Sequence, residues 1–307
     1  MIYKALTISF IHNYKHMKEF RESELIINPD GSIYHLHLRP EQVADTIIVV
    51  GDQDRVSRIS DHFSVIEHKV RNREFVTHTG YYNNKRITVL STGIGTDNID
   101  IVINELDALV NIDLENRVPK ERPISLSIVR LGTSGALQPD IEVDSYVASA
   151  FGLGFDGLLY FYDFDESLIE KEMINAFTAH TNWSRQLPKP YIVAASAGLL
   201  NRVAVGMHQG ITATANGFYG PQGRELRLPL AYPDLNKQIE RFGFQGHRIT
   251  NFEMETSALY GLGRMLGHQT LTICAIIANR IRKEYSKDYR KTIDNLIVEV
   301  LERITNK

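Results

Sequence analysis

Arginine stands beside a loop at three places in the first half of the chain. These are GDQDR at 51–55, RNRE at 71–74 and RLGTSG at 130–135. A glycine-rich turn lets backbone N–H groups approach an anion closely, and guanidinium groups match the tetrahedral oxygens of a phosphate. Each segment alone is typical of a surface arginine and a turn. Their joint occurrence predicts a site for a phosphate-like oxyanion.

These segments need a scaffold that brings them together. From about Ser32, β-branched runs alternate with helical patterns, which favours a one-domain α/β protein with a mostly parallel or mixed sheet. TIIVVGD predicts a buried strand that ends at a glycine turn, and DRVSRISDHF predicts the helix after it. SLSIVRLGTSG predicts another strand and a glycine-rich loop. FVTHTGYYNNKRITVLSTG predicts two strands joined near Asn83 and Asn84.

Several further elements follow from the pattern. Helices are predicted at TDNIDIVINELDALV, DESLIEKEMINAFTAH, NFEMETSALYGLGRMLG and the tail DYRKTIDNLIVEVLERI, and a buried strand at TLTICAIIANR. The first stretch is weakly patterned. Met17 offers a second start, so we interpret residues 1–16 as an upstream extension of the reading frame.

Composition and charge exclude several classes of protein. The 307 residues carry a net charge of -3 without clustered lysine or arginine, which argues against nucleic-acid and polybasic membrane proteins. No run approaches the ~20 apolar residues of a membrane span, and the N-terminus lacks the order of a signal peptide. The single cysteine, Cys274, lies in an apolar run, which favours a reducing compartment. We expect a cytoplasmic protein with a small-molecule partner and no metal.

Five motifs resemble those of a known family. They are VGDQDRV, NREF, STGIG, IVRLGTSGALQPDI and NFEMETSAL. Their order and spacing resemble the nucleoside phosphorylases with the uridine phosphorylase and purine nucleoside phosphorylase fold, from about residue 33 to 301. The resemblance implies an α/β fold with a single domain and a central mixed, partly barrel-like β-sheet flanked by helices. It separates a poorly defined N-terminal extension, 1–30, from a catalytic domain, 31–307.

The resemblance also implies which residues bind phosphate. Gly51, Arg55, Arg130 and Thr133 would hold it within one subunit. Arg73 would reach the phosphate of the neighbouring subunit's site. A homodimer is then the smallest working unit, and a hexamer built as a trimer of dimers would satisfy the same requirement.

The ribose would be bound by three residues that match the family's motifs. Met254 and Glu255 would contact the sugar, with Glu255 accepting hydrogen bonds from its hydroxyls. His35 would reach across the dimer to the 5′-hydroxyl. On purely structural grounds, Glu255 is an acid typical of a helix's first turn, and His35 is a histidine on a half-buried strand.

The segment FYGPQGRE at 218–225 resembles the FYPGQER-like segment of uridine phosphorylases. Gln222 and Arg224 stand at the matching positions, and their groups suit a uracil edge with two carbonyl acceptors and one N–H donor. Phe218 would form a wall for the base, and Ser134 and Gly135 are assigned to the base as well. Alone, the segment is typical of a solvated loop.

One position bears on the choice of base. In the purine-cleaving branch an aspartate protonates N7, and the corresponding place in IIANR is Asn279. Asparagine cannot act as that acid, whereas a uracil anion can be stabilised by fixed donors alone. This favours a pyrimidine nucleoside, with uridine, thymidine and deoxyuridine left open.

The motifs depart from the family pattern at several positions. Gln53 stands where proline is common, and Gly223 replaces an acidic residue. Some uridine phosphorylases hold a monovalent cation through the glutamate that matches Glu74. Asn98, in place of a serine, puts that ion in doubt. No other cofactor is implied, since inorganic phosphate is a co-substrate.

We therefore expect phosphorolysis of uridine to uracil and ribose 1-phosphate, in pyrimidine salvage. Arg55, Arg130, Arg224 and Glu255 would be the catalytic residues. Three alternatives remain: a purine nucleoside phosphorylase, a nucleosidase that uses water, and a nucleoside-binding protein without catalysis. Retention of the phosphate arginines disfavours the nucleosidase.

Overall fold

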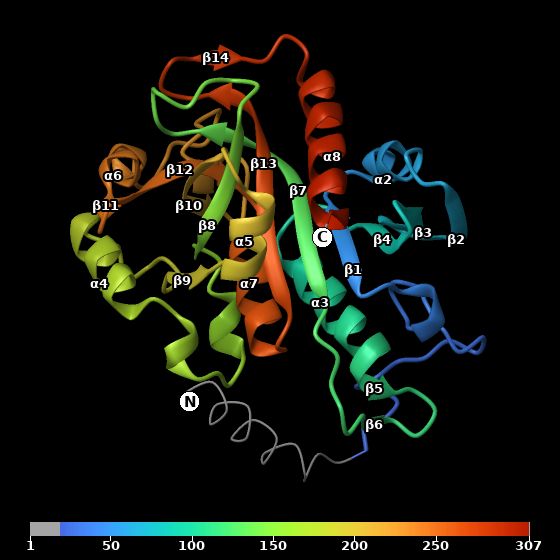
Figure 1. The fold of residues 1–307 in the computed structure, drawn as a ribbon. Coiled ribbons are helices and arrows are strands. Elements are labelled where there is room, and N and C mark those ends of the chain that lie inside the picture. The colour runs from blue at the N-terminus through green and yellow to red at the C-terminus, as the bar shows by residue number, and fades with distance from the viewer. Residues whose placement is uncertain (1–18, 307) are drawn as a thin grey trace, which may run out of the picture.

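Twelve strands form one mixed sheet in the computed structural model, which describes residues 19–306. The strand order is β11-β12-β10-β8-β13-β7-β1-β4-β3-β2, with β9 beside β8 and β14 beside β13. Because β12 also pairs with β7, strands β7, β13, β8, β10 and β12 close into a barrel, and β1, β4, β3 and β2 extend it as a wing (Figure 1). The predicted mixed, partly barrel-like sheet is confirmed. The strands of this sheet are β1 Thr46–Val50, β2 Val65–Asn72, β3 Phe75–Tyr82, β4 Lys85–Ser91, β7 Ser127–Ala136, β8 Tyr146–Gly154, β9 Tyr191–Ala194, β10 His208–Thr214, β11 Gly243–Phe244, β12 His247–Glu253, β13 Gln269–Asn279 and β14 Glu284–Tyr285, while β5 Ile112–Asp113 pairs with β6 Val118–Pro119.

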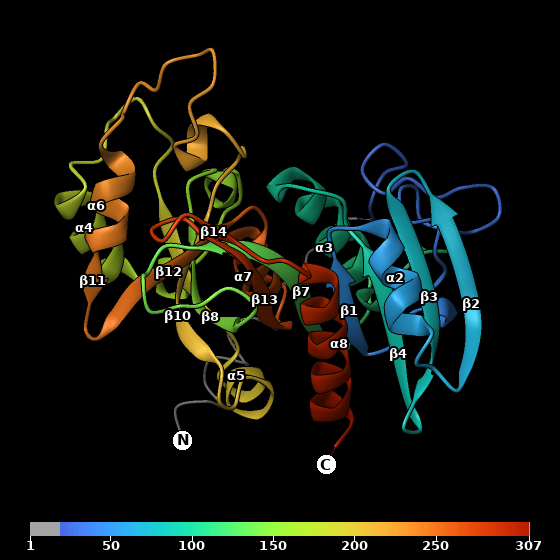
Figure 2. The same ribbon diagram turned by 90° about the horizontal axis from the view of Figure 1, so that it is seen from above.

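Helices cover both faces of this sheet. In β1 every residue is buried: Ile47 and Val49 join the core under α3 and α7, whereas Ile48 and Val50 join the core under α2, α5 and α8. Figure 2 shows α3 and α7 on one side of the sheet and α5 and α8 on the other. Burial on both faces explains why this strand is a continuous apolar run. The helices are α2 Gln53–Ser60, α3 Thr96–Asn111, α4 Lys171–His180, α5 Ala197–Val203, α6 Leu235–Arg241, α7 Thr256–Met265 and α8 Tyr289–Thr305, with 3-10 turns at Pro40–Gln42, Leu158–Phe161, Glu166–Leu168 and Gly220–Gln222.

Local structure differs from the sequence prediction in three segments. The pattern from 251 to 267 predicts one helix, but the chain stays in β12 to Glu253 and α7 begins at Thr256. The glycine-rich segment 132–135 is not a loop, because it continues β7 and pairs with β13 and β12. The helix expected from Asp165 begins only at Lys171, after a 3-10 turn. In the first two segments, pairing with neighbouring strands outweighs local propensity.

The strand directions bring the predicted phosphate segments to one edge. β1 lies parallel to both β4 and β7, so the carboxyl ends of these three strands meet. Gly51 follows β1, and the turn at 92–95 follows β4. The last residues of β12 run beside Gly135 in the opposite direction, which brings Met254 and Glu255 to the same edge. Ligands commonly bind outside the carboxyl ends of such strands.

The described part of the predicted N-terminal extension, residues 19–30, touches the body of the protein. Leu25 is buried in the main core, and Ile27 forms a β-bridge with Ile33. The possible start at Met17 and residues 1–16 lie outside the described residues. Within residues 19–306, no helix is long and apolar enough to cross a membrane.

Candidate active site

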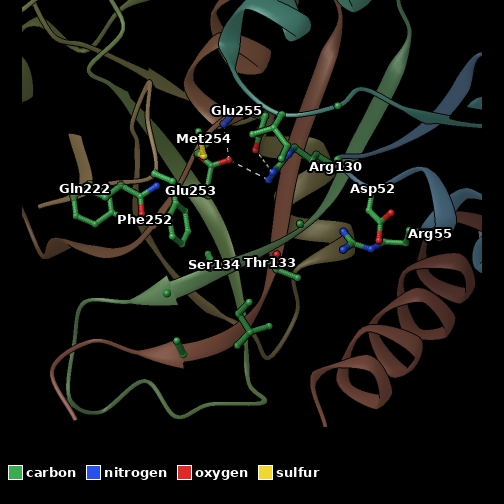
Figure 3. A pocket seen from close by; sticks show the side chains of 18 of the residues that line it. Asp52, Arg55, Arg130, Thr133, Ser134, Gln222, Phe252, Glu253, Met254 and Glu255 are labelled. Carbon is green, nitrogen blue, oxygen red and sulfur yellow. Dashed lines mark hydrogen bonds and ion pairs between the residues drawn. The ribbon is translucent and has the colours of Figure 1, made fainter. Parts of the chain in front are cut away.

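A cavity of about 880 Å³ opens at the edge where these strands end. Figure 3 shows Asp52 and Arg55 at one end of it, Gln222 and Phe252 at the other, and Arg130 between them. Ile94 and Tyr285 are exposed side chains on its lining. Of the residues predicted for the site, the cavity brings together Gly51, Arg55, Glu74, Arg130, Thr133, Ser134, Gly135, Phe218, Gln222, Arg224, Met254 and Glu255.

The phosphate end is built around Arg55 near the start of α2. Its side chain is buried, Nη1 donates to the carbonyl of Leu131 at 3.0 Å, and burial lowers its pKa below the ordinary range. Gly51 lets the loop approach closely, since a Cβ there would lie 3.3 Å from the carbonyl oxygen of Gly93. Nε of Arg55 has no protein partner among the described residues. A buried donor without a partner suits a bound oxyanion.

Arg130 forms a buried ion-pair network in the middle of the cavity. Nη1 lies 3.1 Å from Oε2 of Glu253, and Nη2 pairs with Glu255 (Figure 3). Burial opposes the charge of Arg130, but the carboxylates of Glu255 and Glu253 outweigh it and raise its pKa. Within residues 19–306, its Nε also has no protein partner. The guanidinium therefore keeps its charge and a free donor.

Glu253 was missed in the sequence, although NFEME places it two residues before Glu255. Its carboxylate accepts the N–H groups of Glu255 at 2.9 Å and Thr256 at 3.0 Å, and the hydroxyl of Thr214 at 2.6 Å. These bonds satisfy the first N–H groups of α7. Glu253 therefore anchors the helix start and the guanidinium of Arg130 together.

Glu255 lies just before α7, but its side chain does not cap that helix. Oε1 instead accepts the N–H of Gly95 at 2.8 Å, and the other oxygen pairs with Arg130. Burial raises the pKa of Glu255 against the attraction of Arg130. A carboxylate held in this way between a turn and a cation can accept hydrogen bonds from the hydroxyl groups of a ligand.

Gly132 makes room for Arg130 on the same strand. A Cβ at this position would lie 2.3 Å from Nη1 of Arg130 and 3.0 Å from Sγ of Cys274. We predict that Gly132→Ala displaces the guanidinium and lowers kcat/KM for phosphate about tenfold or more, because a small misplacement of a binding group is costly.

A matched glycine provides the control for that prediction. A Cβ at Gly198, in α5, would meet nothing within 4 Å. Gly198→Ala should leave steady-state kinetics unchanged and alter the free energy of unfolding by no more than about 1 kcal/mol. Equal kinetics in the two variants would show that Gly132 does not position Arg130.

The loop 217–234 supplies three of the predicted base-binding residues, Phe218, Gln222 and Arg224, while Ser134 and Gly135 lie in β7. Nη1 of Arg224 donates to the carbonyl of Phe218 at 2.7 Å and to Oε1 of Gln222, and its Cζ lies 3.8 Å from the centre of the Phe218 ring. Burial, followed by repulsion from Arg280, lowers the pKa of Arg224 to about 10. Gly223 has φ +66°, and a Cβ there would lie 2.0 Å from the Asn236 amide, which explains the glycine at this position.

Two further residues at this end were not predicted. Phe252, at the end of β12, lines the cavity and is buried. The other is Arg280, whose Cζ lies 5.3 Å from the centre of the Phe252 ring. Nη1 of Arg280 is buried and has no protein partner among the described residues, and burial lowers the pKa of Arg280. The segment IIANR contains Arg280, but only the pairing of β7, β12 and β13 brings it close to Phe252 and Arg224.

The Asn279 side chain is bound to backbone groups and does not line the cavity. Its amide nitrogen donates to the carbonyls of Gln138 at 2.9 Å and Ile141 at 2.7 Å, and its oxygen accepts the N–H groups of Ile281 and Arg282. The side chain holds the end of β13 and does not line the cavity. Asparagine supplies no acid at this position, and its side chain is outside the lining of the cavity.

His35 and Arg73 lie outside the chain's own cavity and next to each other. Nδ2 of Asn72 donates to the carbonyl of His35 at 2.8 Å, and Cζ of Arg73 lies 5.7 Å from the ring of Tyr34, which packs edge-on against the His35 ring at 4.7 Å. Arg73 is exposed in a left-handed turn with φ 52°. The two residues predicted to act in a neighbouring subunit therefore share one surface.

The turn expected to help hold a monovalent cation lies against the side-chain amide of Asn98, at the start of α3. A Cβ at Gly93 would lie 2.4 Å from Nδ2 of Asn98 and 3.1 Å from Cγ of Glu74, so both side chains pack against this turn. Across residues 19–306, no group of three or more His, Cys, Asp or Glu side chains could hold a metal ion.

Comparisons with known proteins agree with this geometry. The family model described as "Phosphorylase superfamily" matches residues 45–306. A uridine phosphorylase of Thermococcus kodakarensis is 29% identical over 277 residues, covering 88% of this chain and 86% of the relative. A DeoD-type purine nucleoside phosphorylase of Thermoanaerobacter sp. is 27% identical over 273 residues, covering 87% and 97%.

A solved structure shows the same fold over most of the chain. A nucleoside phosphorylase of Trypanosoma brucei, described as showing uridine phosphorylase activity, superposes with a TM-score of 0.77 at 27% identity and covers 90% of this chain and 99% of that one. A purine nucleoside phosphorylase of Toxoplasma gondii, with a TM-score of 0.62 at 20% identity, supports the fold alone.

Proposed function

Since the chain belongs to the phosphorylase superfamily, we propose that it cleaves the N-glycosidic bond of uridine with inorganic phosphate. The observation that carries this proposal is the order of groups along the cavity. Arg55 lies at one end with a buried Nε that has no protein partner among the described residues, Arg130 and the acceptor carboxylate of Glu255 lie in the middle, and an amide and a guanidinium lie at the other end (Figure 3). Phosphate, ribose and uracil present complementary groups in that order.

Phosphate is the nucleophile in this mechanism. Arg55 and Arg130 bind the dianion, with Thr133 and the backbone of Gly51 as further donors on the lining. Positive charge develops on the ribose ring as the glycosidic bond stretches, and the phosphate stabilises this charge before it attacks C1′. Holding both reactants in line removes much of the entropic barrier. No covalent enzyme intermediate is required.

The ribose lies between the two ends. Glu255 accepts hydrogen bonds from its hydroxyls while Glu253 keeps Arg130 in place. Met254, which lines the cavity beside Glu255, packs against the sugar.

Uracil leaves as an anion. Arg224 and the amide nitrogen of Gln222 donate to its carbonyl oxygens, since Oε1 of Gln222 is engaged by Arg224. Arg280, whose charge repels that of Arg224, adds a second positive group near this end. Donors fixed before the reaction stabilise developing charge without reorganisation. The base pocket needs no general acid for this substrate.

The same geometry ranks the alternatives. A nucleosidase uses water as its nucleophile and needs no phosphate site, so it does not require two buried arginines, Arg55 and Arg130, whose Nε atoms have no protein partner among the described residues. A purine nucleoside phosphorylase, to which relatives also point, protonates its leaving base, and none of Phe218, Gln222 and Arg224, which would surround the base, is a carboxylic acid. A binding protein without catalysis would bind uridine and release no base.

The substrate class is tested by release of free base. Uridine, thymidine, inosine and adenosine would each be incubated with the protein, with and without inorganic phosphate, and the base measured by chromatography. We expect phosphate-dependent release of uracil and no purine release. Purine release at a comparable rate would contradict the pyrimidine assignment.

We further propose that the working unit is a homodimer, alone or within a trimer of dimers. His35 and Arg73 support this, because they share a surface outside the chain's own cavity. Sedimentation equilibrium should show a dimer or a hexamer, and an active monomer would contradict the assignment. A role in pyrimidine salvage in the cytoplasm fits the reaction and the single buried cysteine.

A further inference from the structure

We propose that Glu105 of α3 is the positioning residue for His35, an assignment that rests on the proposed function. Oε1 of Glu105 lies 2.6 Å from Nδ1 of His35, and both carboxylate oxygens accept the backbone N–H of His35 at 3.1 Å. Oε2 also accepts the N–H of Leu36 at 2.8 Å. One carboxylate thus holds both the backbone and the ring of the predicted ribose-binding histidine.

This contact determines which ring nitrogen carries the proton. A carboxylate that already accepts two backbone N–H groups acts as an acceptor, so Nδ1 must donate to it. In the neutral ring, Nε2 then presents a lone pair. The 5′-hydroxyl of a nucleoside in the neighbouring subunit can donate to that lone pair. Carboxylates that orient histidines in metal sites act by the same principle.

Among residues 19–306, Nε2 of His35 has no hydrogen-bond partner. Asn72 holds the carbonyl of His35 at 2.8 Å, and the Tyr34 ring packs against the imidazole at 4.7 Å. The Glu105 side chain is only 13% exposed, compared with 28% for His35. The carboxylate is therefore more buried than the ring that it holds.

The test compares uridine with 5′-deoxyuridine, which lacks the hydroxyl that His35 would bind. In Glu105→Gln, the side-chain oxygen is needed to accept the backbone N–H groups of His35 and Leu36, so the side-chain NH₂ must face Nδ1 of His35. Nδ1 then accepts a hydrogen bond, and the ring proton moves from Nδ1 to Nε2. We expect kcat/KM for uridine to fall about tenfold and that for 5′-deoxyuridine to stay unchanged. His35→Ala should show the same selectivity, and adding Glu105→Gln to it should cost nothing more.

The other carboxylate–histidine pair of α3 provides a matched control. Oδ1 of Asp107 lies 3.3 Å from Nε2 of His268, and His268 is buried. Asp107→Asn should affect the two substrates equally. The proposal is overturned if Glu105→Gln lowers both substrates alike, if His35→Ala spares uridine, or if the double variant loses a further tenfold.

A second measurement separates this proposal from the proposed function. Nitrogen-15 NMR of labelled histidines should show His35 protonated at Nδ1 in the wild-type protein and at Nε2 in Glu105→Gln, with His35→Ala used to assign the signal. A wild-type ring protonated at Nε2 would overturn the pairing whether or not any nucleoside is cleaved. The expected tautomers in a protein that cleaves neither nucleoside would support the pairing and contradict the proposed function alone.

Discussion

Replacing Arg224 by alanine should lower kcat for uridine roughly a hundredfold or more. The guanidinium is held by the carbonyl of Phe218 and by Gln222, and it lies over the Phe218 ring, so it is fixed before substrate binds. Removing one such donor from a charge-stabilising site costs about 10²–10³ in kcat. Steady-state release of uracil at saturating phosphate measures the effect.

The same loop carries a matched control in Arg227. It is an exposed arginine that lines a neighbouring cavity, which shares Arg224 with the cavity proposed for the nucleoside, but Arg227 does not line the latter. Arg227→Ala should keep kcat within about twofold, because surface changes away from such features are small. Unchanged turnover in Arg224→Ala would refute its role in stabilising the leaving base.

Replacing Arg130 by methionine should both weaken phosphate use and destabilise the fold. The side chain would no longer bind the anion, and Glu253 and Glu255 would be left as buried carboxylates without their cation. Breaking a buried ion pair on one side costs about 3–5 kcal/mol. We expect a loss of about a hundredfold or more in kcat/KM for phosphate, and a matching fall in the free energy of unfolding measured in urea.

Arg55→Met separates the two effects of that change. Arg55 contacts a backbone carbonyl and makes no ion pair within the described chain, so its loss leaves no carboxylate unpaired. Phosphate use should fall comparably, while the free energy of unfolding changes by about 1 kcal/mol, the net value of a hydrogen bond. If both variants keep the wild-type dependence on phosphate concentration, the arginines do not bind the anion.

The sequence was most informative where local pattern and tertiary environment agree. In α8, Ile293, Leu296, Ile297, Val300 and Leu301 recur at helical spacing and all are buried. The wholly buried β1 and the hairpin of β3 and β4 were likewise predicted. The ordered motifs also located most of the residues that line the cavity. In a short loop at the end of a strand, residues that are close in sequence are also close in space.

The rest depends on contacts between distant segments. Gly132 to Gly135 have a composition typical of a loop, and only the neighbouring strands β12 and β13 keep them extended. The orientation of Asn279 is set by the carbonyl groups of Gln138 and Ile141, which are 141 and 138 residues away in the chain. Glu105 reaches His35 across 70 residues. No local pattern encodes such partners.

In the proposed reaction phosphate, and not water, receives the ribose. Phosphorus-31 NMR of the protein with uridine and inorganic phosphate tests this directly, with uracil measured in the same samples. We predict a ribose 1-phosphate signal that grows in equal amount to uracil as inorganic phosphate declines. Uracil formed with free ribose, while the phosphate signal stays constant, would contradict the claim.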